Sequence, residues 1–80
     1  NPPLTRWQVL DQYKSYVARE IESGTQLKHM SRHILGLFSG QAGARAWRRY
    51  LSEHAVRYGA GLEVIEAAER IVQQKMQHVA

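Results

Sequence analysis

Apolar residues recur every three or four positions in four segments of this chain, and glycines interrupt the pattern between the segments. This spacing is typical of amphipathic helices, whose apolar residues line one face. Glycine favours helix ends because it readily adopts the left-handed conformation that stops a helix. The interruptions fall at Gly24, from Gly40 to Gly43, and from Gly59 to Gly61. No stretch alternates with a period of two, so we predict an all-α fold, a compact antiparallel four-helix bundle without a sheet.

The boundaries of the helices follow from local signals. Thr5 and Gln8 form a capping-box pattern, so the first helix is expected from Thr5 to Ser23. The second is expected from residues 25–26 to Gly40, and two more follow the later glycines. The residues expected on the buried faces are Trp7, Leu10, Tyr13, Val17 and Ile21 in the first helix; Leu27, Met30, Ile34, Leu37 and Phe38 in the second; Ala44, Trp47, Leu51, Ala55 and Tyr58 in the third; and Leu62, Ile65, Ala68, Val72 and Met76 in the fourth.

The residue types present exclude several kinds of chemistry. The 80 residues include no cysteine, which excludes disulfides, thiol nucleophiles and cysteine-based zinc sites. No nucleotide-binding or serine-hydrolase motif occurs, and no apolar run approaches the roughly 18 residues of a membrane span. His29 and His33 have the spacing of a two-histidine metal site, but no acidic residue lies between residues 25 and 52 to complete it. We therefore expect no catalytic, cofactor-binding or metal-binding residues in this chain.

The positive charge is concentrated in the middle of the chain. Residues 28–57 contain six basic residues and one acidic residue, whereas the segments before and after them have net charges of 0 and −1. Such asymmetry favours a polyanionic partner. The candidate residues for contact with such a partner are Lys28, Arg32, Arg45, Arg48, Arg49 and Arg57.

Three of these arginines follow a glycine-containing turn, at the expected start of the third helix. Free backbone N–H groups and the positive end of the helix dipole make such a position suited to an anion. The charge pattern also leaves other readings open. The arginine stems could cover apolar surface around Trp47, or the charges could meet a protein or a membrane. An arginine-rich helix after a glycine turn also has the outline of a helix-turn-helix DNA-binding motif.

Residues 32–55 have the sequence RHILGLFSGQAGARAWRRYLSEHA, which favours one of these alternatives. It resembles the C-terminal helical segment of A-type tRNA-dihydrouridine synthases, which carry R-H-[apolar]-L-G-L-F-x-G-x-P-G-A-R-x-W-R-R-x-L-S. The remainder of the chain follows the family order more loosely. Ala42 stands where the family usually has proline, which should leave the turn slightly looser.

The resemblance implies an enzyme that reduces D-loop uridines of tRNA to 5,6-dihydrouridine with FMN and NADPH, in the cytoplasm. Its catalysis belongs to an N-terminal TIM barrel with a cysteine general acid, and neither is contained in these residues. Residues 1–4 would be the end of an interdomain linker, and residues 5–80 a C-terminal helical domain that binds tRNA. The predicted RNA-binding residues are then the six basic residues of the middle segment, Lys28, Arg32, Arg45, Arg48, Arg49 and Arg57. The alternative is a structural bundle whose basic residues pack on the barrel without touching RNA.

Overall fold

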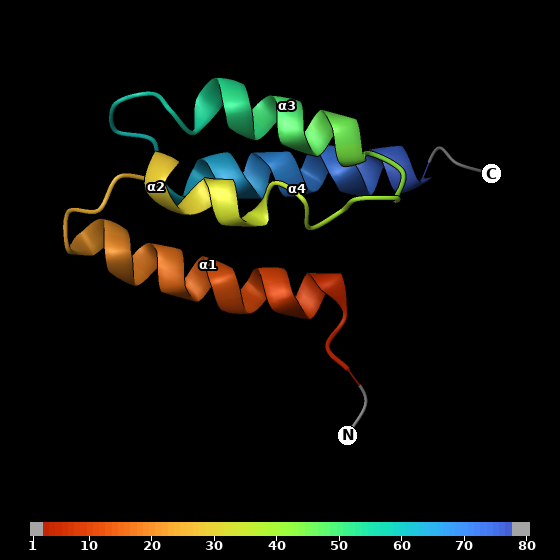
Figure 1. Ribbon diagram of the computed structural model, residues 1–80, viewed down its shortest axis with the longest axis horizontal. Helices are drawn as coiled ribbons and strands as arrows, with labels where there is room; N and C mark the ends of the chain where they lie inside the picture. Colours follow the sequence, from red (N-terminus) through yellow and green to blue (C-terminus); the bar gives the residue numbers. More distant parts are fainter. Residues whose placement is uncertain (1–2, 78–80) are drawn as a thin grey trace.

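The computed structural model describes residues 3–77, and within that range it contains only helices and turns. The elements are α1 (Arg6–Glu22), α2 (Lys28–Ser31), the 3₁₀ helix η1 (Arg32–Ile34), α3 (Ala44–His54) and α4 (Leu62–Gln77). α1 and α3 lie on opposite sides of α4, and successive helices alternate in direction (Figure 1). The predicted all-α antiparallel bundle is therefore confirmed. The ends of the predicted linker and of the predicted domain, residues 1–2 and 78–80, lie outside the described residues.

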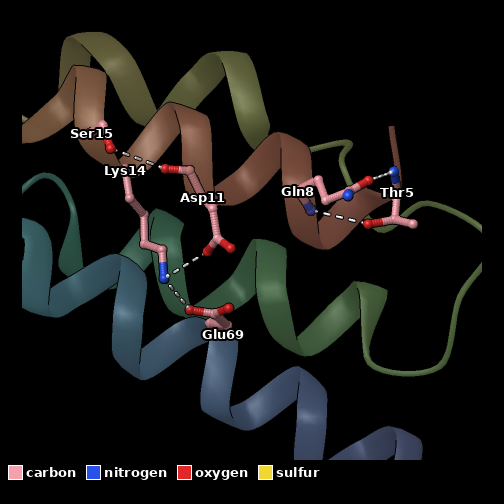
Figure 2. Close-up of polar contacts among 6 residues, drawn as sticks. All are labelled: Thr5, Gln8, Asp11, Lys14, Ser15 and Glu69. Carbon is pink, nitrogen blue, oxygen red and sulfur yellow. Dashed lines mark hydrogen bonds and ion pairs between the residues drawn. The ribbon is translucent and has the colours of Figure 1, made fainter. Parts of the chain in front are cut away.

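The first helix begins and ends within one residue of its predicted bounds. Gln8 N–H donates to Thr5 Oγ1 at 3.1 Å, and Thr5 N–H donates to Gln8 Oε1 at 2.8 Å, which forms the predicted capping box (Figure 2). The helix ends at Glu22, and Gly24 follows with a φ of 97°. None of the helices described between residues 3 and 77 combines the length and the apolar character needed to cross a membrane.

The second helix is much shorter than predicted. The periodicity predicts one helix up to Gly40, but α2 ends at Ser31, η1 ends at Ile34, and turns follow. These turns are closed by i→i+3 bonds, from Ser39 N–H to Gly36 O and from Gln41 N–H to Phe38 O. The apolar positions of the segment are nevertheless placed as predicted. Leu27, Met30, Ile34 and Phe38 are buried, and Leu37 is half-buried.

Hydrogen bonds from other helices explain why the α-helical pattern stops. Three backbone carbonyls of this segment accept hydrogen bonds from distant side chains. The pairs are Tyr13 Oη to Met30 O at 2.8 Å, Trp47 Nε1 to Ile34 O at 2.7 Å, and Arg6 Nε to Leu37 O at 3.0 Å. These bonds satisfy carbonyls that a continuous helix would bond to its own N–H groups four residues later. The segment therefore forms a shorter, irregular connection between α1 and α3.

The core is centred on aromatic side chains from three parts of the chain. Phe38 contacts Trp7 of α1 and Trp47 of α3, with ring centroids 5.0 and 4.9 Å apart. Phe38 and Trp47 are fully buried, as are Leu10 and Val17 of α1. The predicted core positions of α4 are also confirmed. Ile65, Ala68 and Val72 are buried, whereas Leu62 and Met76 are half-buried.

Tyr58 is the predicted core residue that the structure contradicts. The side chain is fully exposed, at 100%. α3 ends at His54, and two turn bonds follow, from Arg57 N–H to His54 O and from Ala60 N–H to Arg57 O. Because the helix stops before residue 58, its periodicity no longer determines where that side chain lies.

Lys14 connects α1 to α4 through a partly buried ion pair. Its Nζ donates to Glu69 Oε1 at 2.9 Å and lies 3.3 Å from Asp11 Oδ1 (Figure 2). The hydrogen bond with Glu69 raises the pKa of Lys14 above its usual value, against the opposing effect of burial. Burial, followed by the nearby Tyr16, raises the pKa of Tyr13. Both groups thus hold their protons more tightly in the folded chain.

These two shifts predict a loss of stability in alkali. A group whose pKa is raised on folding contributes stability that is complete below its unfolded pKa and is lost as the pH rises through its folded pKa. Since the usual values are 10.0 for tyrosine and 10.5 for lysine, the free energy of unfolding should fall above about pH 10, by at most about 1.4 kcal/mol per pH unit for each group. Urea unfolding from pH 8 to 11 measures this slope. The double variant Tyr13→Phe, Lys14→Met should show a shallower slope, and an unchanged slope would contradict the assignment.

Candidate nucleic-acid interface

The orientation of α3 places its arginines on the surface. Trp47, Leu51 and Ala55 are buried on one side of the helix. The hydrogen bond from Trp47 Nε1 to Ile34 O fixes the rotation of α3 about its own axis. With about 100° between successive residues, the arginines at 45, 48 and 49 then fall away from the core. All six predicted RNA-binding residues are exposed: Lys28, Arg32, Arg45, Arg48, Arg49 and Arg57.

Two of the arginines share a hollow with a lysine from α4. Arg45, Arg49 and Lys75 line a shallow depression of about 410 Å³, here called the α3–α4 hollow, which also contains Gln41, Gly43, Ala44 and Ala46. Among residues 3–77, no acidic side chain lines it. Three cations around one depression form a binding surface for an anion.

Lys75 is a candidate residue that the sequence analysis missed. It lies in the last turn of α4, and its segment has a slightly negative charge. The signal that could have identified it is the antiparallel arrangement, which brings the last turn of α4 beside the first turn of α3. Arg45 and Lys75 therefore line the same hollow although 30 positions separate them.

Gly43 permits the close approach of these two helix ends. Its φ is 89°, and a Cβ at this position would lie 3.1 Å from Lys75 Cβ and 3.2 Å from Val72 Cα. Trp47 N–H donates to Gly43 O at 2.9 Å, so the glycine also begins the hydrogen-bond pattern of α3. No side chain caps this helix start, and its first turn contains no acidic residue. The positive helix end and Arg45 therefore both favour an anion here.

Arg49 makes an ion pair that a stronger anion could displace. Its Nε lies 3.1 Å from Glu53 Oε1, and the two side chains are 79% and 54% exposed. Pairs this exposed contribute only about 0.2–1 kcal/mol. The guanidinium group of Arg49 is therefore available to a phosphate, with which it can form two parallel hydrogen bonds.

The remaining predicted residues do not join this cluster. Lys28 and Arg57 line a second hollow, where the connection between α1 and α2 meets the loop after α3. This hollow lies at the opposite end of α3, about 16 Å away for 11 residues at about 1.5 Å each. Arg32 and Arg48 line neither hollow. The six residues therefore form two groups rather than one continuous patch.

The geometry also bears on the other readings of the sequence. Residues 35–43 separate η1 from α3, whereas the helix-turn-helix motif has a turn of three or four residues between two full helices. His29 and His33 are exposed, and within residues 3–77 no three metal-ligating side chains come together. A third histidine, His54, packs against Tyr50, with ring centroids 4.1 Å apart.

The helical fold and the cationic hollow define a small all-α module with a surface suited to phosphates, and comparison with known proteins assigns it to a family. The model of the family described as dihydrouridine synthase (Dus) matches residues 1–77. The chain belongs to the dihydrouridine synthase family, which confirms the resemblance seen in residues 32–55.

Similar curated proteins include several named tRNA-dihydrouridine(20/20a) synthase. The protein from Vibrio cholerae is 52% identical over 67 residues, which cover 84% of this chain and 20% of the relative. That from Xanthomonas campestris is 44% identical over 79 residues, covering 99% and 24%. That from Escherichia coli K12 is 53% identical over 60 residues, covering 75% and 17%. The chain thus spans about a fifth of the length of these relatives, and no solved structure matches it.

Proposed function

We propose that this chain is the tRNA-binding helical domain of a tRNA-dihydrouridine synthase. The observation that carries the proposal is the α3–α4 hollow, in which Arg45, Arg49 and Lys75 surround a depression without an acidic side chain. The names of the relatives, which state that they act on tRNA, identify the polyanion that we propose as the ligand. The three cations bind phosphates of the tRNA backbone, and the exposed Arg32 of η1 and Arg48 of α3 add longer-range attraction. Recognition of this kind depends on the shape and charge of folded RNA.

The chemistry of the parent enzyme belongs to the rest of its length. In this proposal an N-terminal TIM barrel reduces D-loop uridines to 5,6-dihydrouridine with FMN and NADPH, in the cytoplasm where the tRNA is found. The hollows within residues 3–77 are shallow surface depressions, whereas a bound flavin needs a pocket that encloses most of its ring system. These residues therefore do not fit FMN. Mass spectrometry of tRNA treated with the full-length parent tests the activity, and tRNA without added dihydrouridine would contradict it.

The double substitution Arg45→Ala, Arg49→Ala tests the tRNA contact. We expect the affinity for tRNA to fall about tenfold at moderate ionic strength, because two phosphate contacts are lost. The slope of log K against log salt should become shallower by roughly 1.4–1.8. A fluorescence titration of labelled tRNA at several salt concentrations measures both quantities.

A matched control separates the site from net charge. Arg19 of α1 and Arg70 of α4 are exposed and line neither hollow, so Arg19→Ala with Arg70→Ala removes the same charge elsewhere. The control should keep an affinity within about twofold of the original. Equal losses in both variants would mean that only net charge matters. No loss in either, together with salt-sensitive docking to the parent barrel, would favour the structural bundle that does not touch RNA.

A further inference from the structure

Tyr58 is the most exposed of the large hydrophobic residues in the part of the chain that the structure describes. It lies in the loop between α3 and α4, and its side chain is 100% exposed. The loop is held by backbone bonds of its neighbours, from Arg57 N–H to His54 O and from Ala60 N–H to Arg57 O, so its conformation does not depend on the tyrosine ring. The ring is thus presented to solvent by an ordered turn.

A cationic depression is lined in part by this residue. Tyr58 lines a hollow of about 300 Å³, here called the Tyr58 hollow, together with Lys28 and Arg57. Ile21, Leu27 and Ala55 form apolar parts of its wall. No acidic side chain lines it; Glu20 accepts a hydrogen bond from Thr25 Oγ1 at 3.4 Å nearby but is not part of the wall. The Tyr58 hollow is therefore lined by a tyrosine, two cations and apolar side chains.

The charges on the two sides of Tyr58 differ. Toward α2, Tyr58 lines the Tyr58 hollow with Lys28 and Arg57. Toward α4, Tyr58 also lines a smaller depression with His54, Arg57 and Glu63, and Glu63 Oε1 accepts a hydrogen bond from Gly61 N–H at 3.1 Å. Arg57 lines both depressions, so the α2 side differs by the presence of Lys28 and the α4 side by the presence of Glu63. An anionic group beside Tyr58 is therefore favoured on the side of α2.

We propose that the Tyr58 hollow binds one unpaired nucleotide of the RNA, with its base stacked on Tyr58 and its phosphate held by Lys28 and Arg57. The inference rests on the proposed function and adds a second contact to it, at the opposite end of α3 from the α3–α4 hollow. Aromatic side chains stack on bases that are unstacked from their neighbours, which occur in RNA loops and not within a paired A-form helix. The ligand is therefore a nucleotide of a single-stranded loop.

The substitution Tyr58→Ala tests this contact. We expect at least a fivefold loss of affinity for tRNA, since stacking of one base on an aromatic side chain is worth at least that factor. Tyr58→Phe and Tyr58→Trp should keep the affinity within about twofold, because both retain a stacking ring. The salt slope should stay unchanged in all three variants, since no cation is removed. Affinity for a blunt-ended RNA duplex of similar length should not change.

Controls distinguish this inference from the proposed function. Tyr16→Ala removes another exposed tyrosine, from α1, and should leave the affinity for tRNA unchanged. Circular dichroism should show the same folded fraction for Tyr58→Ala as for the original chain, because the ring is solvent-exposed. If Arg45→Ala with Arg49→Ala weakens binding while Tyr58→Ala does not, this inference is overturned and the proposed function stands. If the original chain binds tRNA no more tightly than it binds heparin, both the inference and the proposed function fail.

Discussion

Replacing Trp47 with alanine is expected to lower the free energy of unfolding by about 3–5 kcal/mol. Trp47 is fully buried, its ring packs edge-on against Phe38 at 4.9 Å, and its Nε1 donates to Ile34 O at 2.7 Å. The substitution leaves a cavity between α3 and the irregular connection from α1, and it removes the bond that holds that connection to α3. Since small domains have total stabilities of about 5–15 kcal/mol, most of the folding free energy is at stake.

Urea unfolding followed by circular dichroism measures this change. Trp47→Phe serves as a comparison, because it retains an aromatic ring against Phe38 but removes the N–H donor to Ile34 O. We expect Trp47→Phe to cost about 1–3 kcal/mol, less than the alanine variant. A loss below about 1 kcal/mol for Trp47→Ala would show that Trp47 does not organise the core.

The features that the sequence predicted correctly depend on interactions between near neighbours. The capping box of Thr5 and Gln8 is a contact over three positions, and the apolar spacing of α1 and α4 repeats within each helix. Such patterns require only that each segment be helical and have one buried face. For the same reason the surface position of the arginines followed from the burial of Trp47 and Leu51.

The features that were wrong or missed depend on contacts between distant positions. The second helix is cut short because Tyr13, Trp47 and Arg6 donate to its carbonyls, and no local pattern records those donors. Tyr58 follows the apolar spacing of α3 but lies beyond the end of that helix. Lys75 joins the candidate site only through the antiparallel packing of α3 and α4. The distribution of charge along the chain therefore identified Arg45 and Arg49 of the α3–α4 hollow, but not Lys75 or the packing that brings the three together.

Replacing Gly43 with alanine is expected to lower the free energy of unfolding by about 2–4 kcal/mol. One part is the cost of a left-handed backbone at a residue with a side chain, since φ is 89°. The other is steric, because the new Cβ would lie 3.2 Å from Val72 Cα and 3.1 Å from Lys75 Cβ. The first of these neighbours is backbone, so the start of α3 must move away from α4. That movement separates Arg45 from Lys75.

Gly40 provides the matched control, since it lies in the same connection with a φ of 81° and nothing within 4 Å of its added Cβ. Gly40→Ala should therefore cost only the backbone part, about 1–2 kcal/mol. The difference between the two variants in urea unfolding measures the contact between Gly43 and α4. At a temperature where both variants are folded, Gly43→Ala should also bind tRNA more weakly than Gly40→Ala, because only Gly43→Ala opens the α3–α4 hollow. Equal affinities would mean that the spacing of Arg45 and Lys75 does not matter for binding.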